Sequence, residues 1–317
     1  MTRLLIKRLL LGAIILLVVS VVVFLATQAL PGDPARAILG REATPERLAA
    51  LRLQLHLDEP MYVQYFSWLG NLLRFDLGTS FANGLPVSEL LGPRLNNSLA
   101  LMVCAAVVSI PVSLLVGTYS ALRRDRAFDH ITSVITLVLA SVPEFVVGIV
   151  LVLIFSTGLF SFLPAVYVMT GSDSVWSDPV QLVLPTLTLV LAVSPYIVRI
   201  MRGTMLEVLE SEYVQQAWLK GLPRRTVLRR HALPNAIGPV AQVIALQLAW
   251  LAGGVVVVEF LFRFPGVGFT LVDAVNNRDL PVVQTVTMVI ALVYVVVNLL
   301  ADMVSLAVNP KVRTAAL

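Results

Sequence analysis

Six stretches of the chain are apolar over about the length that a helix needs to cross a bilayer. They lie at about 9–30, 96–122, 131–159, 180–202, 236–262 and 282–307. Because about 30 Å of hydrocarbon requires roughly 20 helical residues, each stretch is long enough to span it. Each must be helical, since backbone amides that face lipid have no water to bond. The pattern predicts an all-α integral membrane protein with six transmembrane helices.

The polar segment 31–95 separates the first two predicted spans and has signs of its own order. Pro31-Gly32-Asp33-Pro34 predicts a turn, because each proline disfavours helix at the residue before it. Thr44-Pro45-Glu46 predicts the start of a short helix to about Leu55, and the aromatic residues of 62–73 predict a second helix. We expect a small extracytoplasmic cap, which either packs on the spans as a lid or contacts a partner.

Basic residues flank alternate spans, and this gives the orientation. The cytoplasmic side of a membrane protein retains Lys and Arg in its short loops. Such residues are Arg3, Lys7 and Arg8 before the first span, Arg123, Arg124 and Arg126 after the second, Arg202, Lys220, Arg224, Arg225, Arg229 and Arg230 after the fourth, and Lys311 and Arg313 after the sixth. Both termini are therefore predicted to be cytoplasmic. The expected divisions are residues 1–30 (tail and first span), 31–95 (cap) and 96–317 (five further spans).

Composition supports a membrane protein and excludes several other classes. The chain is 58% hydrophobic and only 13% charged, with a mean hydropathy of +0.88, whereas soluble domains carry about 25% charged residues. The net charge is +4, but the basic residues lie beside apolar runs, so no nucleic-acid partner is expected. A single cysteine, Cys104, permits neither a disulfide framework nor a thiolate metal site. The first apolar run exceeds the usual 7–15 residues of a signal peptide, so we interpret it as an uncleaved span.

Chemistry-bearing motifs are few. The chain has no Gly-x-x-x-x-Gly-Lys-Ser/Thr loop and no convincing Ser/His/Asp set, so we expect neither an enzyme nor a bound cofactor. Glu144 is the exception, because it follows Pro143 within the third predicted span and intramembrane acids are functional candidates. It either contacts the amine of a solute or serves packing and pairing between helices. From their positions, Pro143, Glu144, Gly148 and Asn298 are candidates to line a translocation pathway.

The cytoplasmic loop at 203–235 is the longest on that side, and it is patterned. Glu210–Lys220 is predicted to form a short helix with Tyr213, Val214, Ala217 and Trp218 on one side. Gly221 ends this helix, and a second short helix is predicted from Pro223 to Ala232. We expect Pro234 to break the second helix and Asn235 to cap the fifth span. Because Ala217 and Gly221 have little or no side chain, they would leave a shallow strip of helix surface that another protein's backbone could approach closely.

This loop resembles that of the membrane subunits of bacterial ABC importers, whose hallmark is Glu-Ala-Ala-x-x-x-Gly followed by x-Leu-Pro. Here it is Glu212-Tyr213-Val214-Gln215-Gln216-Ala217-Trp218-Leu219-Lys220-Gly221, then Arg230-His231-Ala232-Leu233-Pro234-Asn235, with Gln215 and Gln216 replacing the Glu and first Ala. Further motifs are similar to the dipeptide, oligopeptide and nickel permease branch. They are Pro31–Pro34, His56-Leu57-Asp58-Glu59-Pro60, Asp76-Leu77-Gly78-Thr79-Ser80, Glu259–Gly268, and Asn309-Pro310-Lys311, where that branch often has Asp-Pro-Arg.

The resemblance implies a permease subunit of an ATP-driven importer of peptide-like solutes in the bacterial inner membrane. It implies a second, similar permease, two cytoplasmic ATPase subunits that bind ATP and Mg, and an extracytoplasmic binding protein. The residues expected to dock the ATPase are Glu212, Tyr213, Val214, Gln216, Ala217, Gly221, His231, Leu233 and Asn235. The solute stays open between a dipeptide, a longer peptide, glutathione and a nickel chelate.

Other interpretations of the same features remain. The basic loop would also be attracted to anionic membrane lipid. His56, His130 and His231 are too dispersed for a metal site, so His231 is interpreted as a structural hydrogen-bonding residue. An ion-gradient-driven secondary transporter would need a midplane acid or His relay, which only Glu144 approaches. A receptor or assembly scaffold that moves no solute is a third class.

Overall fold

The computed structural model describes residues 2–29, 35, 39, 43–54, 58–158, 160–168 and 175–308. These residues form helices and irregular segments only, as predicted for an all-α membrane protein. The α-helices are α1 (Thr2–Gln28), α3 (Pro45–Gln54), α4 (Met61–Leu73), α5 (Val87–Leu122), α6 (Ala127–Ser141), α7 (Glu144–Val152), α8 (Val183–Glu210), α9 (Glu212–Leu219), α10 (Arg224–Thr226), α11 (Leu233–Leu261), α12 (Val267–Asn277) and α13 (Leu280–Val308). Short π-helical or 3₁₀ turns are η2 (Leu153–Thr157), η3 (Val175–Ser177), η4 (Pro179–Leu182) and η5 (Val227–Ala232).

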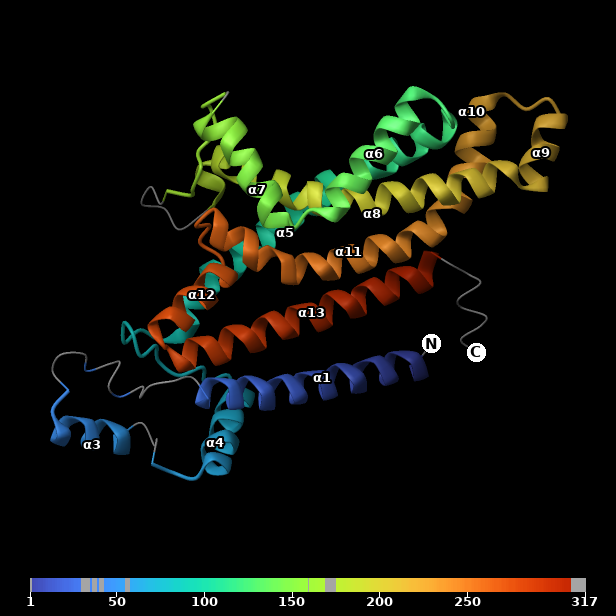
Figure 1. Cartoon of the computed structure of the whole chain (residues 1–317). Coiled ribbons are helices and arrows are strands. Elements are labelled where there is room, and N and C mark those ends of the chain that lie inside the picture. The colour runs from blue at the N-terminus through green and yellow to red at the C-terminus, as the bar shows by residue number, and fades with distance from the viewer. Residues whose placement is uncertain are drawn as a thin grey trace.

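The long helices run side by side as a bundle (Figure 1). α8 packs against α5 and α11, α11 also packs on α13, and α1 lies at the edge on α13. The largest cluster of buried side chains joins α5, α7, α8 and α11, with Leu101, Leu184, Leu189 and Leu251 fully enclosed. α3, α4 and α12 lie at one end of the bundle, and α9 and α10 lie at the other, with the start of α1 (Figure 1).

Five helical segments of the described chain are long and apolar enough to cross a membrane, and a sixth crossing results if α6 and α7 are one span. The third predicted span, 131–159, is therefore not continuous. α6 and α7 are bent by 108° at a break between them. Val142 is extended (φ −102°, ψ 130°) because Pro143 follows it, and Pro143 itself has ψ 144°. Two consecutive non-helical residues make a break rather than the kink expected from one proline.

Other spans are longer than predicted. α5 begins at Val87 rather than residue 96, so the end of the predicted cap belongs to this helix. α8 runs to Glu210, well past residue 202. The fifth span is preceded without interruption by α10 and η5, giving a helical segment from Arg224 to Leu261. Helices of this length exceed what the hydrocarbon requires, so their ends project beyond it.

The cap contains both predicted helices. Thr44 Oγ1 accepts a hydrogen bond from the amide of Arg47 (3.4 Å), so it caps α3 as predicted. On α4, Tyr65 and Trp68 pack against Phe24 of α1, with ring centroids 5.4 and 6.0 Å away. This face of α4 is a lid on α1. The predicted turn at 31–34 and the motif residues His56, Leu57 and 309–311 lie outside the described residues.

Asp279, just before α13, holds the segment that follows α4. Its carboxylate accepts hydrogen bonds from the hydroxyl of Ser80 and from the amides of Phe81 (3.0 Å) and Ala82 (3.3 Å). Asp279 is almost wholly buried, at 3% exposure. A buried carboxylate is tolerated when donors of this kind satisfy it, and here they join segments about 200 residues apart in sequence.

Glu259 plays a similar part near the C-terminal end of α11. Its side chain is fully buried and accepts hydrogen bonds from the Ser98 hydroxyl and the amides of Gly268 (2.7 Å) and Phe269 (3.3 Å). The carboxylate thus binds the N-terminus of α12, where amides lack partners within the helix. Although Glu259 lies near the end of the fifth predicted span, where an acid could extend to the membrane surface, its side chain is enclosed within the fold. A Cβ at Gly266 would collide with this carboxyl group, which accounts for one glycine of the motif.

Replacing Gly268 with Ala should destabilise the fold, because the added Cβ would overlap the backbone of Val256 on α11. Overpacking of this kind typically costs about 1–3 kcal/mol. Thermal unfolding of the detergent-purified protein should show a Tm lowered by several degrees. Gly238→Ala is the matched control, since an added Cβ there meets nothing within 4 Å. Equal melting temperatures for the two variants would contradict the close approach of α12 to α11.

Candidate functional site: a cytoplasmic loop and a mid-span groove

The loop that follows α8 starts from a rigid base. Arg202 on α8 donates from Nε and Nη2 to the two carboxylate oxygens of Asp129 on α6, at 2.5 and 2.7 Å. The Ser120 hydroxyl on α5 donates to the same carboxylate (2.5 Å). The Asp129 side chain is only 2% exposed, so water does not compete for this pair. A two-pronged, buried contact fixes the ends of α5, α6 and α8 relative to one another.

The predicted short helix is present as α9, which begins at Glu212 rather than Glu210 and ends before Gly221 as predicted. Ser211 is extended (ψ 147°) and separates α9 from α8. Gly221 has φ +76°, a left-handed conformation that glycine adopts without steric cost. The amide of Gly221 donates to Trp218 O (2.9 Å), and the amide of Leu222 donates to Ala217 O (3.3 Å), closing the helix end. Gly221 is therefore required by the backbone of the turn.

One side of α9 is buried within the chain itself. Val214 (0% exposed) and Ala217 (6%) pack against Val227 of η5 and against Leu222. Ala217 does not therefore provide a shallow strip for a partner, and this part of the prediction is wrong. The small side chain of Ala217 lets the two arms of the loop pack closely. Val214 and Ala217 hold the loop together instead of forming its surface.

The opposite side of α9 faces outward. Leu219 (87% exposed) presents apolar area there, with Glu212 and Gln216 exposed beside it, and Tyr213 (42%) and Trp218 (39%) flank the buried side. Gly221 is exposed at the end of the helix. Leu219 was missed by the sequence analysis. The signal was present in the sequence, because Leu219 directly precedes Lys220 and Gly221 at the end of the helix. A soluble helix would carry a polar side chain at such a position. An apolar surface at the tip of a loop is typical of an interaction site.

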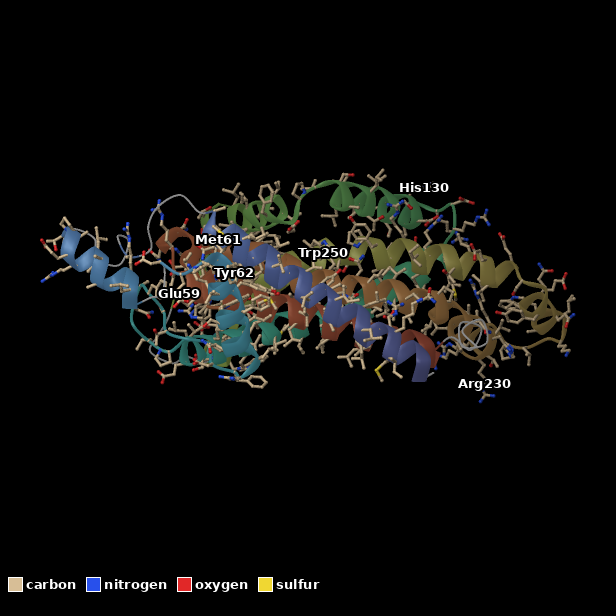
Figure 2. The ribbon with its side chains drawn as sticks, turned by 90° about the horizontal axis from the view of Figure 1, so that it is seen from below. Glu59, Met61, Tyr62, His130, Arg230 and Trp250 are labelled. Carbon is tan, nitrogen blue, oxygen red and sulfur yellow. The ribbon has the colours of Figure 1, made fainter. Side chains whose placement is uncertain are left out.

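The second arm of the loop differs from the prediction, because Pro234 does not break it. The backbone passes from α10 through the π-helical turn η5 into α11 without leaving helical dihedrals. The wider turn accommodates a proline, which has no amide to donate. Asn235 lies inside the helix rather than at its cap, and its side chain donates to His231 O (2.7 Å). Arg230 and the loop lie at the end of the bundle opposite Tyr62 (Figure 2).

Two further loop residues are partly buried. Leu233 packs against the cluster formed by α8 and α11, which includes Met201, Met205 and Ala236. The His231 imidazole makes no hydrogen bond to any residue that the structure describes, and only its backbone carbonyl is engaged, so its interpretation as a hydrogen-bonding side chain is not supported. No group of three or more potential metal ligands occurs within the described ranges.

Two of the predicted pathway residues, Glu144 and Asn298, line one groove although 154 positions separate them in sequence. The groove has a volume of about 510 Å³ and is lined by α7, α11 and α13. A second hollow of about 290 Å³ lies on the other side of Glu144, between α6, α8 and α11. The residues common to both are Glu144, Gln247 and Trp250.

Gly148 and Pro143 do not line either hollow. Gly148 is buried, and a Cβ there would meet a methyl group of Leu261 at 2.5 Å and of Thr188 at 3.3 Å, so it serves close packing of α7 on α8 and α11. Pro143 acts indirectly by breaking the span. The break places Glu144 at the first position of α7, where the chain turns towards α11.

Trp250 lies about midway between the two ends of the molecule, between Tyr62 and Arg230 (Figure 2). Its indole ring lies over Gly254, where a Cβ would approach the ring to 2.8 Å. Gly253 beside it would place a Cβ in open space. Gly254 therefore gives the indole ring room to pack, and Gly253 leaves the groove open beside it, about midway along the molecule.

Comparison with known proteins identifies the family. The profile of the family described as binding-protein-dependent transport system inner membrane component matches residues 91–314. A second profile, for the N-terminal part of such membrane components, matches residues 1–102. Together the two profiles cover nearly the whole chain.

Relatives match over similar lengths. One from Sinorhizobium fredii, named as a peptide ABC transporter permease, is 36% identical over 97% of this chain and 98% of its own. One from Brucella abortus, named as a peptide transport system permease, is 38% identical over 99% of each chain. The glutathione transport system permease of Salmonella typhi is 37% identical over 94% of each. The chain therefore belongs to the family of inner membrane components of binding-protein-dependent transport systems, and is a multi-pass ABC importer permease.

Proposed function

We propose that this chain forms half of the translocation pathway of an ATP-driven importer of peptide-like solutes. The observation that carries the proposal is the cytoplasmic loop, in which a short helix with an exposed apolar side is held rigidly between two spans. The names of the relatives support peptides, including the tripeptide glutathione, as the class of solute.

The outer side of α9 is the proposed contact with an ATPase subunit. Gln216 and Leu219 supply its centre, Tyr213 and Trp218 its two flanks, and Glu212 and Gly221 lie exposed beside them. His231 and Asn235 belong to the second arm of the loop and are proposed to complete the contact. Val214, Ala217 and Leu233 support it from inside. ATP and Mg would be bound by the ATPase subunits and not by this chain.

Movement of the ATPase would reach the pathway through continuous helices. α9 is joined to α8 by the single residue Ser211, and to the segment 224–261 by a turn of a few residues. That segment carries Gln247 and Trp250 of the groove. A rigid-body shift of α9 therefore tilts α8 and α11 and changes the width of the groove, which is a two-state element of the kind that transport requires.

The family to which the chain belongs supports the remaining parts of the proposed assembly. A second, similar permease would close it, two ATPases would dock on the two loops, and a binding protein would deliver solute to the end that carries α3, α4 and α12. Both termini of this chain would be cytoplasmic, since the start of α1 lies at the same end as α9 (Figure 1). Membrane lipid would surround the exposed apolar faces.

Uptake of a labelled peptide by the reconstituted transporter should depend on ATP rather than on an ion gradient. With its binding protein present, uptake into proteoliposomes containing ATP should persist after a protonophore collapses the proton gradient and should stop when ATP is omitted. The reverse pattern would favour the gradient-driven secondary transporter. Empty liposomes and a transporter with inactive ATPases serve as controls.

Leu219→Asp should reduce copurification of the ATPases with the tagged chain by about tenfold or more, because it places a charge in the proposed apolar contact. Quantitative mass spectrometry of the mild-detergent extract measures the loss. Leu73→Asp is the matched control, since Leu73 is 73% exposed at the far end of the molecule on α4. ATPase recovery that is unchanged in Leu219→Asp would reject α9 as the docking helix.

The proposed orientation can be tested by cysteine labelling in a Cys104→Ser background, which removes the only native thiol. Phe75→Cys, at an 89% exposed position, should react with a membrane-impermeant maleimide in cells whose outer membrane is permeabilised and whose inner membrane is intact. Arg225→Cys should react only after the inner membrane is opened. If Arg225→Cys reacts in intact cells and Phe75→Cys reacts only after the inner membrane is opened, the topology is the reverse of the one proposed.

A further inference from the structure

We infer that the groove at Glu144 binds the protonated amino group of the solute as it passes the middle of the membrane. The inference rests on the proposed function and adds the chemical class that the pathway recognises. The site consists of the Glu144 carboxylate, the rings of Trp250 and Tyr294, and the side-chain amides of Gln247 and Asn298. None of these residues belongs to the cytoplasmic loop or to the buried carboxylate contacts described above.

The first observation is the state of Glu144. Its carboxylate has no hydrogen bond or ion pair with any described residue, whereas Asp129, Glu259, Asp279 and Asp302 each have at least one. It is partly exposed and lies between the two hollows. An acid within a membrane span is costly unless it has a partner or faces a water-filled cavity, so an unpartnered carboxylate at this position favours a cation that enters the groove.

The second observation is the pair of aromatic rings. Trp250 (39% exposed) and Tyr294 (45%) line the same groove from α11 and α13. Gly254 holds the indole ring in place, and Gly253 leaves the neighbouring space open. Aromatic faces attract ammonium groups through their quadrupole, most strongly for Trp and where water is partly excluded. A carboxylate beside two such rings favours an organic ammonium group.

The third observation is the set of hydrogen-bond acceptors. Asn298 donates from its side-chain nitrogen to Tyr294 O (3.0 Å), which leaves its carbonyl oxygen as an acceptor at the groove. Gln247 lines both hollows and has no hydrogen-bond partner in the described part of the chain. An ammonium group has three N–H donors, and a carboxylate and two amide oxygens can accept all three.

The charge of the residues that line the two hollows also favours an ammonium group. Neither hollow is lined by Lys, Arg or His, so a carboxylate of the solute finds no cationic partner there. A divalent metal cation takes about six or more oxygen ligands, which is more than the carboxylate and the two amide oxygens supply. The site is also open on one side, which suits weak, transient binding in a pathway that must release what it binds.

Saturation-transfer NMR on the purified permease and ATPase complex, without the binding protein, tests this directly. The probes are trialanine and propionyl-dialanine, which differ only in that the second lacks the amino group. With wild-type protein, trialanine should show the stronger signal. Glu144→Gln should lower the trialanine signal about tenfold and bring it to the level of propionyl-dialanine, because only the charged contact is lost. Glu144→Asp should retain the preference for the amine.

Two further variants separate this site from general damage. Trp250→Phe should keep most of the preference for the amine, and Trp250→Leu should lose most of it, since only the former keeps an aromatic face. Asp302→Asn is the matched control, because Asp302 lies on α13 outside the groove and is paired with Arg8. It should leave the preference unchanged.

The outcomes also distinguish failure of this inference from failure of the proposed function. If Glu144→Gln retains the wild-type preference for trialanine while ATP-driven peptide uptake is normal, the ammonium site is refuted and the importer stands. The same result would indicate that Glu144 pairs with the second permease, which crosslinking of Glu144→Cys to that subunit would show. If wild-type protein shows no ATP-driven uptake of any peptide, the proposed function itself fails.

Discussion

The need to satisfy every backbone hydrogen bond in lipid determines where this chain can be irregular. Helices satisfy their own amides and carbonyls, so departures from helix are tolerated only beyond the hydrocarbon or where the chain lines a cavity. The structure obeys this rule closely. The cap, the turn before α12 and the loop after α8 lie at the ends of the bundle, and the break between α6 and α7 borders one hollow through Val142 and both hollows through Glu144. The break between α6 and α7 and the groove beside it therefore reflect the same requirement, that irregular backbone within a span must line a cavity.

Buried carboxylates fasten the ends of the helices, and they do so in one chemical manner. Asp129, Glu259 and Asp279 each accept several hydrogen bonds from residues far away in sequence or from the exposed amides of a helix start. Such contacts are directional, whereas apolar packing between spans in lipid is not driven by exclusion of water. The polar contacts therefore set the angles at which the spans meet. Glu144 differs from these three because the fold gives it no partner.

Much of the architecture could be predicted from the sequence because the signals were local. Apolar runs located the long helices, and Gly221, with the residues before it, located the end of α9. The errors concern properties that depend on neighbours. Pro143 was visible, but the 108° bend requires Val142 to be extended as well. Pro234 has the same chemistry, yet a π-helical turn absorbs it. Ala217 was expected to form a surface that a partner approaches, and Gly148 to line the pathway. Small residues equally allow close packing inside a protein, and only the tertiary contacts with Val227 and Leu261 decide between the two.

The arrangement of α1 has a consequence for how the protein is made. α1 packs mainly on α13, through the close approach of Gly12 to Val295, the hydrogen bond from Gln284 to Thr27 and the ion pair between Arg8 and Asp302. A ribosome synthesises α1 long before α13, so α1 enters the bilayer well before the surface that receives it exists. Arg8 has no Asp302 to pair with until α13 has been synthesised. The pairing of α1 with α13 is therefore a late step in assembly, and a ribosome that stalls before α13 leaves α1 without its main neighbour.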